Sequence, residues 1–179
     1  HDLNKSTESY KKAIIIKPNY HQAFNNIGCN YMSQGNPQKA LTYLQEALNI
    51  KPDYMDAFYN ISDVLSSVIF NYSNPKLLSL IEIILDKKTI VRPNDIANSA
   101  LSLMKFEKHS KVLFKKNPSL GINGCIFEII NKVCKNTLLL KLMKVCPLPN
   151  LDLEQTFIEM RRVLLKSVYE IKFSEDCLK

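Results

Sequence analysis

Side chains that could perform acid–base catalysis or hold a metal ion are few in this sequence, and they do not cluster. The three histidines are His1, His21 and His109, and none has a second ligand at the spacing of a zinc site. Glu154 and Glu159 fall on one predicted helix, where an exposed carboxylate needs no catalytic explanation. We therefore predict no metal site and no catalytic residues.

The glycines do not form a nucleotide-binding or S-adenosylmethionine-binding turn. Such a turn needs several glycines at close spacing after a strand, so that the backbone can approach the cofactor. The four glycines are Gly28, Gly35, Gly121 and Gly124, and the apolar spacing around them is helical rather than alternating. We predict an all-α chain that binds no cofactor and is not an enzyme.

Cysteine usage and hydropathy indicate the compartment. The five cysteines are odd in number and contain no C-x-x-C pair, which favours a reducing environment. Three of them lie among apolar residues, where a thiol commonly packs as a small hydrophobe: Cys125, Cys134 and Cys146. The densest apolar stretches, residues 77–85 and 137–142, are shorter than the roughly 20 residues of a membrane span. We expect a cytoplasmic protein with no membrane partner.

Lysines dominate the charge of residues 105–144. This segment has nine lysines against two glutamates, a balance of +7 that equals the excess of the whole chain. Spacings of mostly three and four residues predict one basic helix face that could meet phosphates or acidic protein. It comprises Lys105, Lys108, Lys111, Lys115 and Lys116. No aromatic ladder is interleaved for base stacking, and a solvated lysine face is ordinary, so nucleic-acid binding is an alternative rather than the main prediction.

An internal repeat organises the first part of the chain. Residues 10–28 align with residues 44–62 at an offset of 34, with nine identities in nineteen positions. The identical pairs are Ala13 and Ala47, Ile16 and Ile50, Lys17 and Lys51, Pro18 and Pro52, Tyr20 and Tyr54, Ala23 and Ala57, Phe24 and Phe58, Asn26 and Asn60, and Ile27 and Ile61. A period of this length is typical of stacked helical hairpins.

Residues 21–54 make one complete copy, and their spacing predicts an antiparallel hairpin of two helices. Two apolar stripes recur at three and four residues. They are Phe24, Ile27 and Tyr31 in the first helix and Ala40, Leu44 and Ala47 in the second. Between them, residues 34–37 supply a helix stop, a glycine tolerant of positive φ, a cap and a first-turn proline. Gly28 indicates a close approach of a neighbouring helix, because glycine costs a helix roughly 1 kcal/mol relative to alanine.

These residues resemble the tetratricopeptide repeat family. Its eight diagnostic positions hold Phe24, Ile27, Gly28, Tyr31, Ala40, Leu44, Ala47 and Pro52. The preceding copy is incomplete, so we expect the chain to begin inside a repeat. The following copy degenerates at Asn74-Pro75, where an alanine of its second helix is expected. The resemblance implies two to three hairpins in residues 1–73, stacked as a superhelix that binds protein or peptide.

By analogy with the family, the first helix of each hairpin lines the inner face of the superhelix. The expected exposed positions are Gln22, Asn25, Asn26, Cys29 and Met32 in one repeat and Asp56, Tyr59, Asn60 and Asp63 in the next. Asn26 and Asn60 are equivalent, and an amide can both donate to and accept from a peptide unit. They resemble the asparagine ladder of O-linked N-acetylglucosamine transferase, although a merely solvated surface is equally open. A carboxylate clamp is not expected, because these positions lack Lys and Arg.

Residues 74–147 are predicted to form a helical extension without repeats, and residues 148–179 a long helix that leads toward a region outside this sequence. The predicted helices are residues 75–85, 96–116 with a bend near 106–109, 126–135, 137–145, and a last one from a cap at Asn150 or Asp152 to about residue 171. For the second of them, Pro93 biases Arg92 away from helix, and Asn94 or Asp95 is available as the cap.

Residues 86–165 resemble the region after the repeats in tetratricopeptide proteins of marine bacteria. The resemblance lies in residues 85–93, 140–143 and 146–149. In those relatives an S-adenosylmethionine-dependent methyltransferase domain often follows, which implies a bacterial chain that stops before any catalytic domain.

The sequence therefore predicts an all-α protein with tetratricopeptide hairpins followed by a helical extension, acting as a noncatalytic scaffold for a protein or peptide. Two alternatives remain. The chain could be an N-terminal, substrate-recruiting region of a larger methyltransferase or glycosyltransferase, or it could bind nucleic acid through residues 105–144. Neither the partner nor the oligomeric state follows from the sequence.

Overall fold

The computed structural model describes residues 2–87, 92–108, 110–114, 131–146, 151–158 and 160–162. The regular elements in these residues are helices, with no strand among them, which confirms the predicted all-α class. The chain forms two compact units. One comprises His1–Ile69 with Ile83–Ser99, and the other comprises Phe70–Glu82 with Ala100–Lys179.

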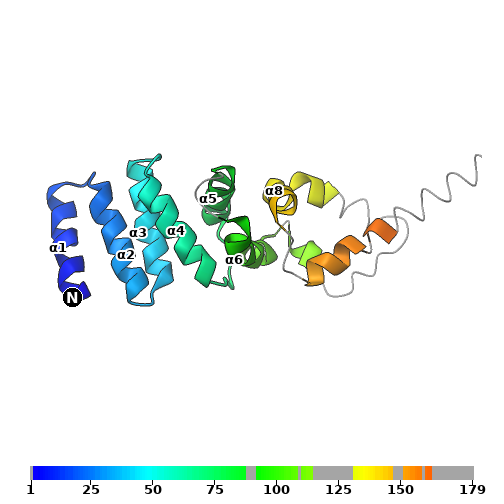
Figure 1. The fold of residues 1–179 in the computed structure, drawn as a ribbon, viewed down its shortest axis with the longest axis horizontal. Coiled ribbons are helices and arrows are strands. Elements are labelled where there is room, and N and C mark those ends of the chain that lie inside the picture. Colours follow the sequence, from blue (N-terminus) through cyan, green and yellow to red (C-terminus); the bar gives the residue numbers. More distant parts are fainter. Residues whose placement is uncertain are drawn as a thin grey trace, which may run out of the picture. The chain divides into compact units, whose positions relative to one another are not determined.

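The first unit contains four consecutive helices, each packed against the next (Figure 1). They are α1 (Leu3–Ile16), α2 (His21–Ser33), α3 (Pro37–Ile50) and α4 (Met55–Ser67). In addition to these sequential contacts, α2 contacts α4, which starts the next repeat. This pattern confirms the predicted helical hairpins.

The turn between α2 and α3 is encoded locally. Gly35 has a φ of 70°, a left-handed conformation that side chains disfavour, and its N–H donates to the Met32 carbonyl at 2.9 Å. The Asn36 side chain accepts from the Lys39 N–H at 3.2 Å and so caps α3, with Pro37 in the first turn. Each role predicted for these turn residues is confirmed.

Gly28 marks the closest approach of α2 to α3. A Cβ added at this position would lie 2.7 Å from the Leu44 Cγ and 3.3 Å from the Ala40 carbonyl oxygen. Leu44 and Ala40 are both 0% exposed, so neither can move aside without disturbing the core. The packing reason predicted for this glycine is confirmed.

After α4 the chain turns into α5 (Pro75–Asp86) and then α6 (Pro93–Phe106). The α5 helix begins where predicted, because the Asn74 side chain accepts from the Leu77 N–H at 3.1 Å as a cap. Ser99 of α6 hydrogen-bonds through its hydroxyl to the Leu65 and Val68 carbonyl oxygens at the end of α4. This contact fixes residues 83–99 within the first unit.

The start of α6 corrects the sequence prediction. Neither Asn94 nor Asp95 is the cap of a helix over residues 96–116, because the helix already begins at Pro93. A proline is favoured in the first turn, where its missing N–H leaves no hydrogen bond unmade. Asn94 and Asp95 therefore lie inside the first turn.

The end of α6 is a second correction. The helix stops at Phe106 instead of bending and continuing. The Ser110 N–H donates to the Glu107 carbonyl at 3.2 Å in the turn that follows, and the 3-10 helix η1 (Lys111–Phe114) comes next. Leu113 in η1 is fully buried, so burial of an apolar side chain fixes this change of direction.

In the second unit, α8 (Thr137–Val145) has the predicted bounds. The Asn136 side chain accepts from the Leu139 N–H at 2.9 Å to cap α8, and its Nδ2 donates to the Ser110 Oγ at 2.8 Å. Of the helix predicted over residues 126–135, residues 131–135 are described and are helical. One asparagine thus both starts a helix and joins it to the turn after α6.

Residues 151–158 and 160–162 are helical as well. Asp152 lies within this helix, so the prediction that it is a cap is wrong. The Thr156 Oγ1 donates to the Leu113 carbonyl at 3.0 Å, which joins the helix to η1. The alternative cap, Asn150, and the predicted continuation to residue 171 lie outside the described residues.

Candidate functional site

The inner face is the name we give to the predicted binding positions of α2 and α4. It comprises Gln22, Asn25, Asn26, Cys29 and Met32 of α2 and Asp56, Tyr59, Asn60 and Asp63 of α4. Both helices pack against α3 and also contact each other, so α3 holds them in fixed positions. Two sets of side chains that are about one repeat apart in the sequence are thus brought together.

A hydrogen bond between two asparagines joins the two helices of the inner face. The Asn60 Nδ2 donates to the Asn25 Oδ1 at 2.9 Å. Asn25 is only 5% exposed, so the expectation that it is an exposed binding position is wrong. A buried amide oxygen needs a hydrogen-bond partner, and Asn60 supplies it. Asn25 therefore acts as a structural partner of Asn60 beneath the surface.

The remaining inner-face residues are accessible to different degrees. Gln22, Asp56, Tyr59 and Asp63 are exposed, whereas Asn26, Cys29, Met32 and Asn60 are half-buried. An amide has two N–H groups and one acceptor oxygen, and Asn60 uses one N–H within the protein. In the predicted ladder of Asn26 and Asn60, Asn60 therefore has only its second N–H and its oxygen available for a peptide. Peptide binding by these residues stays a prediction.

Tyr54 and His21 border the inner face, and the sequence analysis did not assign either of them to it. Their rings meet edge to face with centroids 4.7 Å apart. Partial burial raises the pKa of the Tyr54 phenol to about 12, and a hydrogen bond to the Asp56 carboxylate and its charge act in the same direction. Tyr54 thus stays protonated at neutral pH.

A sequence signal for Tyr54 existed in the repeat. Tyr20 is its equivalent in the preceding copy, and both tyrosines follow a Lys-Pro pair. In each copy the lysine Nζ lies over the ring, at 5.3 Å for Lys17 and Tyr20 and at 5.7 Å for Lys51 and Tyr54. The matched pairs therefore build the same loop before each first helix.

Cys29 is a half-buried thiol of α2 and is not in a disulfide. Burial raises the pKa of this thiol, and the negative charges of Asp63 and Asp56 raise it further. Because the thiolate is the nucleophilic form, a raised pKa makes Cys29 a poor nucleophile at neutral pH. It contributes packing to the inner face.

Among the described residues, the lysines of the predicted basic face do not share one helix. Lys105 lies in the last turn of α6, and Lys108 follows the helix end at Phe106, so the two do not share a continuous helix. Both are exposed, and the Lys105 Nζ lies 4.0 Å from an Asp152 carboxylate oxygen. Lys111 is in η1. Lys115 and Lys116 lie outside the described residues, so phosphate binding by this segment stays a prediction.

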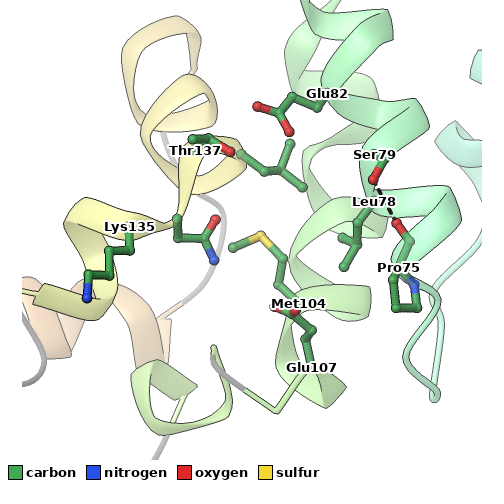
Figure 2. A pocket seen from close by; sticks show the side chains of 10 residues that line it. Pro75, Leu78, Ser79, Glu82, Met104, Glu107, Lys135 and Thr137 are labelled. Atoms are coloured by element: carbon green, nitrogen blue, oxygen red, sulfur yellow. Dashed lines mark hydrogen bonds between the residues drawn. The ribbon is translucent and has the colours of Figure 1, made fainter.

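The second unit contains a cavity of about 230 Å³. Its lining comprises Pro75, Leu78, Ser79, Glu82, Met104, Glu107, Lys135, Asn136, Thr137 and Leu138. Figure 2 shows the amine of Lys135 directed away from the other labelled side chains. The Glu82 carboxylate lies 3.4 Å from the Lys141 Nζ, and the Glu107 carboxylate accepts from the Ser110 hydroxyl at 2.9 Å. Since its carboxylates already have partners within the protein, the cavity is the weaker candidate site.

Two features are absent from the described part of the chain. Among these residues, no group of three or more His, Cys, Asp or Glu side chains is placed to hold a metal ion. In the same part of the chain, no helix combines the length and apolar character that crossing a membrane requires.

Comparison with known proteins gives one match. Residues 21–54, which form α2, α3 and the loop up to α4, match the sequence model of the tetratricopeptide repeat. No curated protein matches the chain, and the resemblance of residues 86–165 to a marine bacterial group stays a prediction. The hairpin of α2 and α3 is therefore similar to a tetratricopeptide repeat.

Proposed function

We propose that this chain is a noncatalytic scaffold that binds a protein or an extended peptide on its inner face. Repeats of this kind stack helix pairs so that successive first helices present one extended binding surface. The tetratricopeptide match at residues 21–54 and the contact between α2 and α4 support this proposal.

The hydrogen bond from Asn60 to Asn25 is the observation that carries the proposal. It fixes α4 against α2 from below, while Gln22, Tyr59 and Asp63 remain exposed above it. A surface held in place before binding loses less conformational entropy when a ligand is bound. The inner face is therefore preorganised for binding.

The chemistry of the inner face supports a noncatalytic role. Two groups at the face that could act as nucleophiles, the Cys29 thiol and the nearby Tyr54 phenol, both have a raised pKa and stay protonated at neutral pH. Neither can act as an anionic nucleophile or a base under these conditions. What the face offers is hydrogen-bonding groups, carboxylates and one exposed aromatic ring.

A matched pair of tyrosine variants tests the proposal. Peptides are first selected from a displayed random library on the full chain, and their affinity is then measured by calorimetry. Tyr59→Ala should weaken binding about fivefold or more, because exposed tyrosines are frequent anchors of interfaces. Tyr72→Ala is the control, since Tyr72 is 39% exposed against 44% for Tyr59 and lies outside the inner face. Equal losses in both variants, or no loss in either, would count against the inner face as the binding surface.

A further inference from the structure

The inner face carries charge of one sign only. α2 contains no Lys, Arg, Asp or Glu, and the charged side chains of α4 are Asp56 and Asp63. Both aspartates are exposed. This contrasts with the formal net charge of +7 for the whole chain. A negative helix face in a positive protein selects among ligands by their charge.

In the described part of the chain, two lysines lie over aromatic rings at or next to α4. The Lys51 Nζ lies 5.7 Å from the centre of the Tyr54 ring, and the Lys87 Nζ lies 5.0 Å from the centre of the Phe58 ring. Phe58 is buried on the core side of α4, away from the inner face. No salt bridge joins Asp56 or Asp63 to a lysine or arginine among the described residues.

The spacing of the exposed side chains on α4 defines a stripe. Asp56, Tyr59, Asn60 and Asp63 are three, four and seven residues apart, which places them on one side of the helix. Seven residues of helix span about 10 Å. In a polyproline II segment, side chains three residues apart point the same way and are about 9 Å apart. Two basic side chains at that separation would match the two aspartates.

Tyr59 lies between the two aspartates and is 44% exposed. Its ring can take a lysine ammonium or an arginine guanidinium over its face, an attraction that adds to the charge of the carboxylates. The half-buried Asn60 beside it has polar groups for the peptide backbone. The stripe thus combines charge, an aromatic ring and an amide in one row.

Two titratable groups next to the stripe, Cys29 and Tyr54, respond to its negative charge. Burial is the main cause of the raised pKa of Cys29, and Asp63 and Asp56 add to it. Burial is also the main cause for Tyr54, with Asp56 adding to it. Negative charge raises the pKa of both groups because it disfavours their anionic forms.

We infer that the inner face binds an extended cationic segment of a partner protein, in which two lysine or arginine side chains are three residues apart and contact Asp56 and Asp63. This inference rests on the proposed function and specifies the chemistry of the partner. The carboxylates set the preference for charge, and Tyr59 contributes contact area between them.

Three synthetic peptides test the inference on the full chain. Each has proline at most positions, which keeps it extended, and the same residue at every third position, which is lysine, glutamine or glutamate. The lysine peptide should bind most tightly, and its affinity should fall as salt is raised, because salt screens exposed charges. The double variant Asp56→Asn, Asp63→Asn should bind the lysine peptide about fivefold more weakly, because it loses two exposed ion pairs.

A charge-matched control separates a local effect from a change in net charge. Glu46→Gln with Asp53→Asn removes the same two charges at exposed positions outside the inner face and should leave the affinity unchanged. The inference is overturned if the lysine peptide binds no better than the glutamine peptide, or if both double variants weaken it equally. Library peptides that remain sensitive to Tyr59→Ala would still support the scaffold in that case, so the two proposals can fail separately.

Discussion

The hairpin of α2 and α3 and the segment from α6 to η1 both carry side chains spaced at three and four residues, yet only the hairpin has the geometry that its spacing predicts. In the hairpin, the spaced residues are apolar, and four of them are buried in the core: Ile27, Ala40, Leu44 and Ala47. In the other segment they are lysines, and α6 ends at Phe106 before most of them. Apolar periodicity is maintained by the free energy of burial, whereas exposed charges have no such requirement. A regular spacing of three and four residues thus predicts a helix face when the spaced side chains must be buried.

The largest expected effect tests that contrast directly. Leu44→Ala should lower the free energy of unfolding by about 2 to 5 kcal/mol, because it leaves a cavity beside Gly28. Lys108→Ala, in the basic segment, should change it by no more than about 0.5 kcal/mol. Urea denaturation of the full chain measures both. Similar values for the two variants would contradict the distinction between apolar and charged periodicity.

A second prediction concerns the asparagine pair of the inner face. Asn60→Ala should lower the free energy of unfolding by about 1 to 3 kcal/mol, because the buried Asn25 oxygen loses its donor. The double variant Asn25→Ala with Asn60→Ala should cost less than the sum of the two single variants, since it leaves no amide oxygen without a partner. Urea denaturation of all three variants completes the cycle. Additive losses would show that the bond contributes little to the position of α4.

A third prediction compares the same residue type in the two compact units. Asn36 and Asn136 each cap a helix, and replacing either with alanine should cost about 1 kcal/mol. Asn136→Ala should cost more, because Asn136 also donates to the Ser110 hydroxyl at 2.8 Å. Asn136→Asp keeps the capping acceptor and removes that donor, so it should recover the capping part only. If Asn36→Ala lowers the free energy of unfolding more than Asn136→Ala does, this prediction is wrong.

Much of the fold could be predicted where the signal is local. The turn at Gly35 and Asn36, the start of α5 and the bounds of α8 all follow from capping residues next to the helices that they delimit. The end of α6 could not be predicted in this way. It is associated with the burial of Leu113 and with the hydrogen bond from Asn136 to Ser110, which joins residues 26 positions apart.

The candidate site shows the same division. The exposure of Gln22, Asp56, Tyr59 and Asp63 was predicted from the position of each residue within the repeat. The burial of Asn25 was not, because its donor is 35 residues away and belongs to the next repeat. The 34-residue repeat aligns Asn60 with Asn26, whereas the hydrogen-bond partner of Asn60 is Asn25. The identities between the two copies therefore do not indicate this contact.

The smallest expected effect concerns the edge of the inner face, where Tyr54 meets Asp56. The pKa of Tyr54 is about 12 because of burial, a hydrogen bond to Asp56 and the charge of that carboxylate, in that order. Asp56→Asn removes the charge and leaves a weaker acceptor, so the pKa should fall toward the ordinary value of 10.0 without reaching it, since burial remains.

Ultraviolet titration of the tyrosinate measures this shift, and Tyr54→Phe identifies the band by removing it. A raised folded pKa means that the unfolded chain loses the Tyr54 proton first, so the contribution of this group to stability falls as pH rises from about 10 to about 12. The loss should be smaller in Asp56→Asn. A Tyr54 pKa that does not change in Asp56→Asn would show that burial alone determines it.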